Sequence, residues 1–503
     1  MNDRFVIRRL PTGVPGLDEL LGGGLAEFSF NLIAGSPGSG KTTLAHQIMF
    51  ALANPERRAL FFTVLGEPPL KMLRYQQQYR FFDIAKVNDT IRFINLADDL
   101  VTGNFERVLA RIIEEVERFE PGVVFVDSFR SVVLASQDQG ESSGVPALQH
   151  FVQRLGMHLT SWHATTFLIG EYMTLESEAN AVFTVADGIL WLQQSLHRNS
   201  MVRKIQVTKM RGHATLAGLH TFRISDDGIQ VFPRTIMTGS AMANGDTAGA
   251  QSAAQVYLSM GVPELDRMMG GGLPAGYSLL IAGPSGAGKS LLATAFLAEG
   301  ARAGEKGVIA AFEKSPGMSR NPRLDGLIAS GEVGVIDTRA LDLSIDETLY
   351  ALAEMIRRTG ATRIVIDSLS GFELALAPTF REDFRESLYR MVAVLTGMGA
   401  TVVMISELED RYTDLRFSPY GAAFLTDAII VQRYVELRGE LKRVMAVVKV
   451  RNSEHSHELR LFEIIDAGIV IGEPRPELEA LLTGHPRAAA STPPAARAKA
   501  SRS

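Results

Sequence analysis

The stretch GSPGSGKTT, from Gly35 to Thr43, decides the fold of this chain, and a second version of it, GPSGAGKSL, runs from Gly283 to Leu291. Both follow the pattern G-x-x-x-x-G-K with Ser or Thr next, in which the glycines let backbone N–H groups point at phosphate oxygens. An apolar run precedes each loop, and a helical run follows whose N-terminus adds the positive end of its dipole. This context predicts two phosphate-binding loops of the P-loop type.

The two loops predict sites for ATP. Lys41 and Lys289 are expected to reach the β and γ phosphates, and the hydroxyls of Thr42 and Ser290 are expected to bind Mg²⁺. A chance glycine-rich turn is the alternative for a lone match, but two copies in register argue against it. The loop residues assigned to nucleotide binding are Gly35, Gly38, Ser39, Gly40, Lys41, Thr42 and Thr43, and Gly283, Gly286, Ala287, Gly288, Lys289, Ser290 and Leu291.

An acidic residue ends one later strand in each half. VVFVD ends at Asp127 and RIVID ends at Asp367, each with a serine next. A P-loop needs such a second acidic residue to hold Mg²⁺ through water. The alternative for a strand-terminal aspartate is the cap of the following helix. In this context both aspartates are assigned to the nucleotide and to the metal. The expected Mg²⁺ ligands are Thr42, Asp127, Ser290 and Asp367.

The two loops belong to an internal duplication. TGVPGLDELLGGGL starts at Thr12 and MGVPELDRMMGGGL starts at Met260, an offset of 248 residues that later becomes 240. A period this long indicates two complete domains rather than a solenoid. The expected organisation is a first domain over 1–234, a linker over 235–255, a second domain over 256–473 and a largely disordered tail over 474–503.

Within each copy, short apolar runs alternate with helical stretches. Continuous apolar runs of this length predict strands that are buried on both faces. In the first copy we expect strands over 30–35, 58–64, 122–128 and 165–170, an amphipathic helix over 105–119 and hairpin strands near 201–212. Such alternation is typical of an α/β fold. The predicted fold class is therefore α/β, with two tandem P-loop domains, each a mainly parallel twisted sheet flanked by helices.

Composition narrows the class of protein. The 503 residues are 46% hydrophobic and 21% charged, which is typical of a globular protein with sizeable cores. The absence of cysteine excludes disulfides, thiolate metal sites and cysteine nucleophiles. The net charge of −5 argues against a protein that coats nucleic acid. Because we find neither a signal-peptide pattern nor an apolar run of bilayer length, we expect a cytoplasmic protein that does not enter membranes.

Hydrolysis needs a group that orients or deprotonates the attacking water. In the second copy, VIAAFEKSP places Glu313 at a strand end that is expected to face the γ phosphate. The gapless alignment puts Leu65 opposite Glu313, and a leucine cannot polarise water. Glu67 lies two residues later in the first copy. Glu313 and Glu67 are the predicted catalytic residues, and either Glu67 reaches in from its loop or the first copy hydrolyses poorly.

Pairs of cations match near the end of each copy. TKMRG contains Lys209 and Arg211, and VKVRN contains Lys449 and Arg451. Because alternate residues of a strand share one face, each pair can reach a single anion. A solvated sheet edge is the alternative. All four residues are assigned to nucleotide binding.

Together these motifs resemble the KaiC family of RecA-like ATPases. The resemblance rests on the duplicated P-loops, the GVPGLDELLGGGL opening, FEKSP, the Asp-Ser strand ends, KMRG and YVELRGELKR, over about residues 5–470. It implies tandem RecA-like domains that bind ATP and Mg²⁺, and a homo-hexamer of two stacked rings with ATP between neighbours. It implies that the Lys–Arg pairs reach the neighbour's γ phosphate and that Glu313 is the second ring's catalytic glutamate. It also implies signalling or clock-like regulation with KaiB-like or other signalling proteins.

The sequence departs from the clock protein of that family. Leu65 and Gly66 stand where its first ring has a Glu-Glu pair, and Ala423 and Phe424 stand where its second ring has the Ser-Thr pair that takes up phosphate. The C-terminal tail does not resemble the segment that recruits the clock's activator. ATPase activity is therefore expected, and the paired phosphorylation cycle is expected to be absent.

Three other interpretations stay open. One is a serine/threonine autokinase with shifted acceptors, for which Ser418 and Thr426 are the candidates. A second is a nucleic-acid motor, which would need a basic pore loop. The net charge of −5 and the absence of a zinc or OB-type module disfavour it, so nucleic acid is not an expected partner. The third is a scaffold in which ATP mainly holds subunits together, and the first copy fits that description locally.

Overall fold

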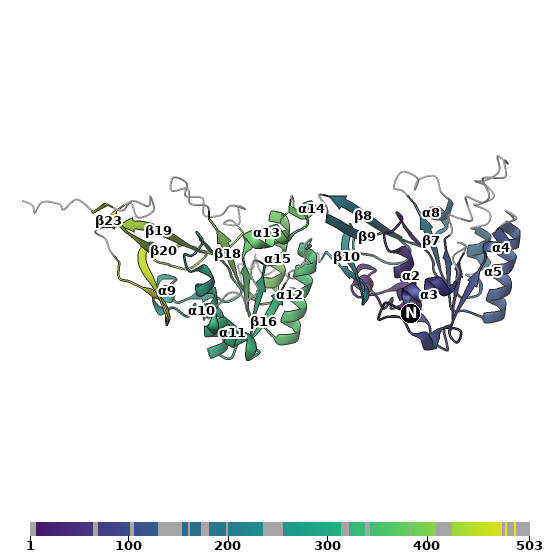
Figure 1. Cartoon of the computed structure of the whole chain (residues 1–503), viewed down its shortest axis with the longest axis horizontal. Coiled ribbons are helices and arrows are strands. Elements are labelled where there is room, and N and C mark those ends of the chain that lie inside the picture. The colour runs from purple at the N-terminus through teal and green to yellow at the C-terminus, as the bar shows by residue number, and fades with distance from the viewer. Residues whose placement is uncertain are drawn as a thin grey trace, which may run out of the picture. The chain divides into compact units, whose positions relative to one another are not determined.

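The computed structural model describes residues 7–63, 69–100, 105–128, 153–158, 161–172, 181–197, 200–234, 255–312, 321–337, 343–381, 384–408, 425–474, 478–479 and 487–488. Contacts divide the chain into two compact units, Met1–Thr235 and Ile236–Ser503 (Figure 1). Among the described helices, none has the length and apolar character needed to cross a membrane.

The first unit is built on a nine-stranded sheet with the order β11-β10-β9-β8-β3-β7-β6-β4-β5. The six strands from β8 to β5 in that order are parallel, and β9, β10 and β11 continue the sheet in antiparallel fashion. The strands are β1 Arg9–Leu10, β2 Leu25–Ala26, β3 Phe30–Gly35, β4 Ala59–Thr63, β5 Ile91–Asn95, β6 Val123–Asp127, β7 Thr165–Glu171, β8 Gly188–His197, β9 Ser200–Met210, β10 His220–Ser225 and β11 Gly228–Phe232. The helices are α1 Leu17–Leu20, α2 Lys41–Leu52, α3 Pro69–Gln76, α4 Ala97–Leu100, α5 Phe105–Phe119 and α8 Ala181–Val185, with a 3₁₀ turn, η1, over Ile84–Lys86.

The second unit repeats this plan with the order β16-β15-β17-β18-β14-β19-β20-β21-β22. Its strands are β12 Tyr257–Leu258, β13 Leu273–Pro274, β14 Ser278–Gly283, β15 Gly307–Ala311, β16 Val333–Asp337, β17 Arg363–Asp367, β18 Thr401–Glu407, β19 Ala428–Leu437, β20 Glu440–Val450, β21 Arg460–Ile465, β22 Gly468–Ile471, β23 Leu478–Glu479 and β24 Arg487–Ala488. Its helices are α9 Pro263–Met268, α10 Lys289–Arg302, α11 Pro322–Ala329, α12 Ile345–Thr359, α13 Leu369–Ala375, α14 Pro378–Arg381 and α15 Phe384–Gly397. The predicted α/β fold with two mainly parallel sheets is confirmed.

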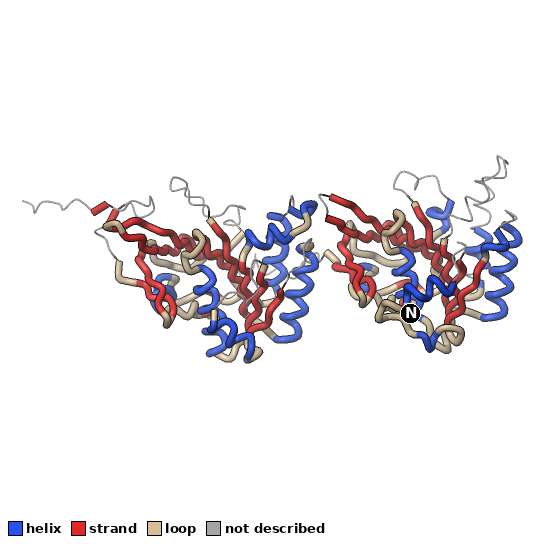
Figure 2. Tube along the Cα trace, in the orientation of Figure 1, coloured by secondary structure: helices blue, strands red, loops and turns tan. Residues whose placement is uncertain are grey.

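Each sheet is covered on both faces, as Figure 2 shows. In β14, Leu279 and Ile281 pack in a cluster with α9 and α10, whereas Leu280 and Ala282 pack in a cluster with α12, α13 and α15. Side chains of a strand alternate between the two faces, so a strand covered on both sides must be apolar at every position. This is why the central strands read as unbroken apolar runs in the sequence.

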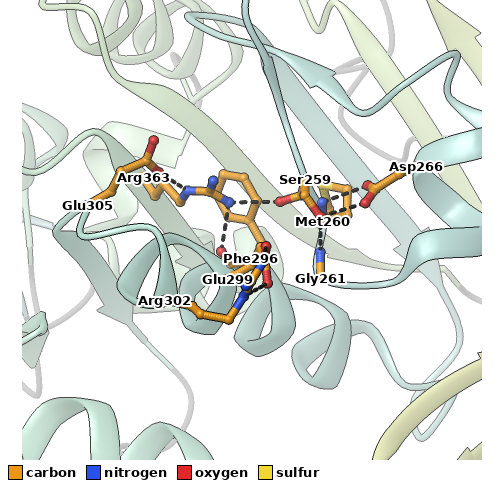
Figure 3. Close-up of polar contacts among 9 residues, drawn as sticks. All are labelled: Ser259, Met260, Gly261, Asp266, Phe296, Glu299, Arg302, Glu305 and Arg363. Atoms are coloured by element: carbon orange, nitrogen blue, oxygen red, sulfur yellow. Dashed lines mark hydrogen bonds and ion pairs between the residues drawn. The ribbon is translucent and has the colours of Figure 1, made fainter.

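A buried arginine forms hydrogen bonds with several segments of the second unit (Figure 3). Arg363, the first residue of β17, is 3% exposed, and its Nη1 donates to the carbonyls of Ser259 and Phe296 at 2.8 and 2.9 Å. Its Nε donates to Glu305, and its guanidinium lies 4.5 Å from the ring centre of Phe296. Ser259 in turn donates its hydroxyl to Asp266 of α9. One cation therefore joins β17, α10 and the segment before α9.

The first unit contains a buried histidine that makes its stability depend on pH. His46 of α2 is fully buried, 4.6 Å from Phe61 between ring centres, and burial lowers its pKa to about 4. The unfolded chain binds the proton near pH 6.5, so unfolding is favoured progressively as the pH falls from about 6.5 to 4. We expect His46 to cost the first unit about 3 kcal/mol of unfolding free energy across that window.

This dependence can be measured on the full chain, because both tryptophans, Trp162 and Trp191, lie in the first unit. Urea unfolding followed by tryptophan fluorescence at pH 7, 5.5 and 4.5 should show the loss. The variant His46→Leu should be less sensitive to acid than the parent. An equal loss of stability with pH in both proteins would show that other groups cause it.

Candidate functional site

Both P-loops have the backbone conformation that a phosphate cradle requires. Gly40 and Gly288 precede the first residues of α2 and α10 with φ of 99° and 105°. A side chain is strained at such angles, so glycine is needed there. The loop N–H groups and the helix N-terminus then face the same point, which is a site for anions. Of the other loop residues, Ser39 and Ala287 are fully buried, and Thr43 and Leu291 lie in the first turn of their helices.

The P-loop lysines are buried and turned onto their own loops. Lys41 is 7% exposed and donates from Nζ to the carbonyl of Ser36 at 2.8 Å. Lys289 is 9% exposed and donates to the carbonyls of Gly283 and Pro284 at 2.8 and 2.7 Å. Each ammonium therefore lies where phosphate oxygens would replace the loop carbonyls as its acceptors.

The structure brings Thr42 and Asp127 together. The hydroxyl Oγ1 of Thr42 donates to Oδ2 of Asp127 at 2.8 Å, although 85 positions separate them in the chain. A hydroxyl and a carboxylate at this separation suit Mg²⁺, which prefers oxygen ligands and keeps several waters and phosphate oxygens. Among the described residues there is no cluster of three or more His, Asp or Glu that would hold a metal by itself. The residues present therefore fit a metal that is shared with a phosphate.

In the second unit the corresponding groups surround one cavity of about 380 Å³. Its lining includes Lys289, Ser290 and Asp367, together with Glu407 at the end of β18. The P-loop residues Gly286 and Gly288 form part of the same wall. The cavity thus collects the predicted phosphate and metal groups of the second copy at one sheet edge.

Two carboxylates that lie at these sites were not predicted from the sequence. Glu171 ends β7 opposite Gly35, and Glu407 ends β18 opposite Gly283. Burial lowers the pKa of Lys41, and Glu171 opposes this more strongly than Asp127 does. In the sequence, the apolar segments TTFLIGE and TVVMISE both end in glutamate. Neither segment matches a known phosphate-binding motif, so the glutamates were not assigned to the sites.

The Lys–Arg pairs lie at the opposite end of each sheet. Nζ of Lys209 donates to the carbonyls of Phe183 and Thr184, and burial and then the charge of Arg211 lower its pKa. Arg211 pairs with Asp187 at 3.0 Å, and the other oxygen of Asp187 accepts from the N–H of Phe30, the first residue of β3. The P-loop follows the other end of β3, about 17 Å away at 3.3 Å per residue.

The second unit repeats this arrangement. Lys449 donates to the carbonyl of Thr426 at 2.6 Å, and Arg451 pairs with Asp427 at 3.2 Å. Asp427 accepts from the N–H of Ser278, the first residue of β14. The structure therefore does not bring either pair to the P-loop of its own unit.

Several predicted residues lie outside the described part of the chain. They are Leu65, Gly66, Glu67, Glu313, Ser418, Ala423 and Phe424. Thr426 is described, and its side chain is fully buried. A phosphate could reach that hydroxyl only if the Thr426 side chain became exposed.

The family model described as ATPase: KaiC matches residues 10–236 and again residues 258–476. The chain belongs to the KaiC ATPase family. The duplication seen in the sequence is thus a pair of KaiC repeats, and the predicted resemblance is confirmed.

Curated KaiC proteins align with nearly the whole chain. The circadian clock oscillator protein KaiC of Picosynechococcus sp. is 27% identical over 506 residues, which cover 95% of this chain and 92% of that protein. The circadian clock protein KaiC3 of Synechocystis sp. is 26% identical, with 95% of each chain covered. The KaiC of Parathermosynechococcus lividus is 26% identical, with 96% of this chain and 90% of that protein covered.

Proposed function

We propose that the chain forms two domains, over 1–234 and 256–473, and that both bind Mg-ATP and hydrolyse it to ADP and phosphate. The observation that carries this proposal is the hydrogen bond of Thr42 to Asp127 beside the buried Lys41, at the start of a helix. Membership in an ATPase family supports it. Magnesium, when bound, would neutralise charge on the phosphates, and Thr42 with Asp127, and Ser290 with Asp367, would hold it.

Different residues of the chain bind the phosphates and orient the attacking water. The loop N–H groups and the helix N-terminus bind the phosphates. Lys41 and Lys289 leave the loop carbonyls and bind the β and γ phosphate oxygens. A water then attacks the γ phosphorus, oriented in the second domain by Glu313. ADP leaves with the bridging oxygen.

The position of the Lys–Arg pairs supports assembly into a homo-hexameric ring. Arg211 and Arg451 lie at the strand ends away from their own P-loops, so a γ phosphate within their reach belongs to a neighbouring subunit. Each arginine would exchange its aspartate partner for that phosphate. The rings would then signal through KaiB-like or other partner proteins, as the clock-protein names of the curated relatives suggest.

Loss of one arginine should weaken assembly or turnover. We expect Arg211→Ala and Arg451→Ala to remove a charge-assisted contact to phosphate that contributes about 1.5–3 kcal/mol. The control is Arg80→Ala, because Arg80 forms an exposed ion pair with Asp227. Light scattering with ATP and steady-state ATP turnover measure the effect. A monomer with normal turnover would contradict the ring.

Native mass spectrometry of the full chain with ATP and Mg²⁺ tests the proposed function as a whole. We expect a hexamer with two nucleotides per subunit, together with phosphate release in a turnover assay. Nucleotide binding without release would favour the scaffold. Stoichiometric phosphate on the protein would favour the autokinase, and salt-dependent DNA binding would favour the motor.

A further inference from the structure

One strand next to each P-loop strand ends in a glutamate. β7 lies between β3 and β6, and β18 lies between β14 and β17, so each separates the P-loop strand from the strand that ends in the metal-binding aspartate. The register places Glu171 opposite Gly35 and Glu407 opposite Gly283. Neighbouring strands are about 4.8 Å apart, so both carboxyl groups belong to the edge on which the phosphates must rest.

The cavity of the second unit agrees with this placement. Glu407 lines it together with Lys289 and Asp367. Glu171 is half-buried and Glu407 is exposed, so neither is sealed from water or from a ligand. The same position carries the same chemistry in both units.

In the first unit, such a carboxylate would supply an acid that the position aligned with Glu313 lacks. Glu313 comes two residues after β15 in the sequence, and β15 is three strands from β14, or about 14 Å across the sheet. The corresponding position in the first copy is Leu65, which has no acid. Glu171 lies on the strand directly beside the first P-loop strand.

We propose that Glu171 and Glu407 are catalytic carboxylates that face the γ phosphate and orient the attacking water, with Glu171 as the principal group of the first domain and Glu407 acting beside Glu313 in the second. This rests on the proposed ATPase function. The water oxygen forms a bond to the γ phosphorus while the bond from phosphorus to the β–γ bridging oxygen breaks. ADP leaves with that electron pair, and the water proton passes to the carboxylate and then to the released phosphate.

The test uses the full chain with Lys289→Ala, which leaves the first site as the nucleotide site. Into this parent we would introduce Glu171→Gln and, as the matched control, Glu114→Gln, which changes an exposed glutamate of α5 that pairs with Arg111. Two measurements are made: affinity for ATPγS and for ADP by calorimetry, and turnover of ATP. The affinity ratio reports whether the carboxylate faces the third phosphate, and it does not depend on hydrolysis.

We expect Glu171→Gln to bind ATPγS about threefold or more tightly, because a like charge is removed, while ADP affinity stays unchanged. Its kcat should fall at least about tenfold with little change in KM. Glu114→Gln should change neither the affinities nor kcat. The mirror pair, Glu407→Gln in a Lys41→Ala parent, should show the same rise in the ATPγS-to-ADP ratio.

Equal weakening of ATPγS and ADP would overturn the proposal, because it would show that Glu171 only holds Lys41 in place. An unchanged kcat in Glu171→Gln, or an equal loss of turnover in Glu114→Gln, would overturn it as well. The Lys289→Ala parent could bind both nucleotides and hydrolyse none. In that case an unchanged ratio of ATPγS to ADP affinity in Glu171→Gln would contradict the proposal. A parent that binds neither nucleotide would contradict the proposed function itself, and the role of Glu171 with it.

Discussion

Replacing Glu313 by glutamine is expected to lower the ATP turnover of the second domain by roughly 10²–10⁴-fold. Glutamine keeps the size of the side chain but cannot accept a proton from the attacking water. The phosphate cradle of Lys289, Ser290 and Asp367 is unchanged, so ATP should still bind. Steady-state rates at saturating ATP, with hexamer content checked, measure the effect.

The variants to compare with Glu313→Gln change residues of the first copy. Glu67→Gln should change total turnover little, and Leu65→Glu should raise it by adding a carboxylate at the position that aligns with Glu313. A protein that loses most turnover with Glu67→Gln but keeps it with Glu313→Gln would reverse the assignment. The first domain would then be the more active one.

Removing the Arg363 guanidinium is expected to lower the unfolding free energy of the second unit by about 3–5 kcal/mol. Arg363→Ala leaves the carbonyls of Ser259 and Phe296 without their donor and Glu305 without its cation. Buried polar groups that lose their partner keep the full cost of desolvation. Urea unfolding followed by far-ultraviolet circular dichroism measures the loss.

Two controls make this result specific. The transition seen by tryptophan fluorescence should not move, because both tryptophans lie in the first unit. Arg302→Ala should change stability little, since the Arg302 side chain that pairs with Glu299 is 77% exposed. A similar loss in both arginine variants would show that the burial of Arg363 is not what matters.

The local motifs of the sites were predictable because their chemistry lies in contiguous residues. Gly40, Lys41 and Thr42 are neighbours in sequence, and their roles follow from a loop that ends in a helix. Asp127 was predictable because strands of a parallel sheet end at one edge, and the 2.8 Å contact with Thr42 agrees with that expectation. Glu171 was not, since its relation to Gly35 depends on the order of the strands.

By itself, the sequence determined the duplication, the α/β class and the phosphate loops, because repeated motifs and apolar period are local properties of the chain. Only the tertiary structure decided which strands are neighbours. That order places Glu171 and Glu407 beside the P-loops, and it places Arg211 and Arg451 at the far ends of their sheets. The physical reason is that strand order comes from packing between residues far apart in the chain, which no local pattern records.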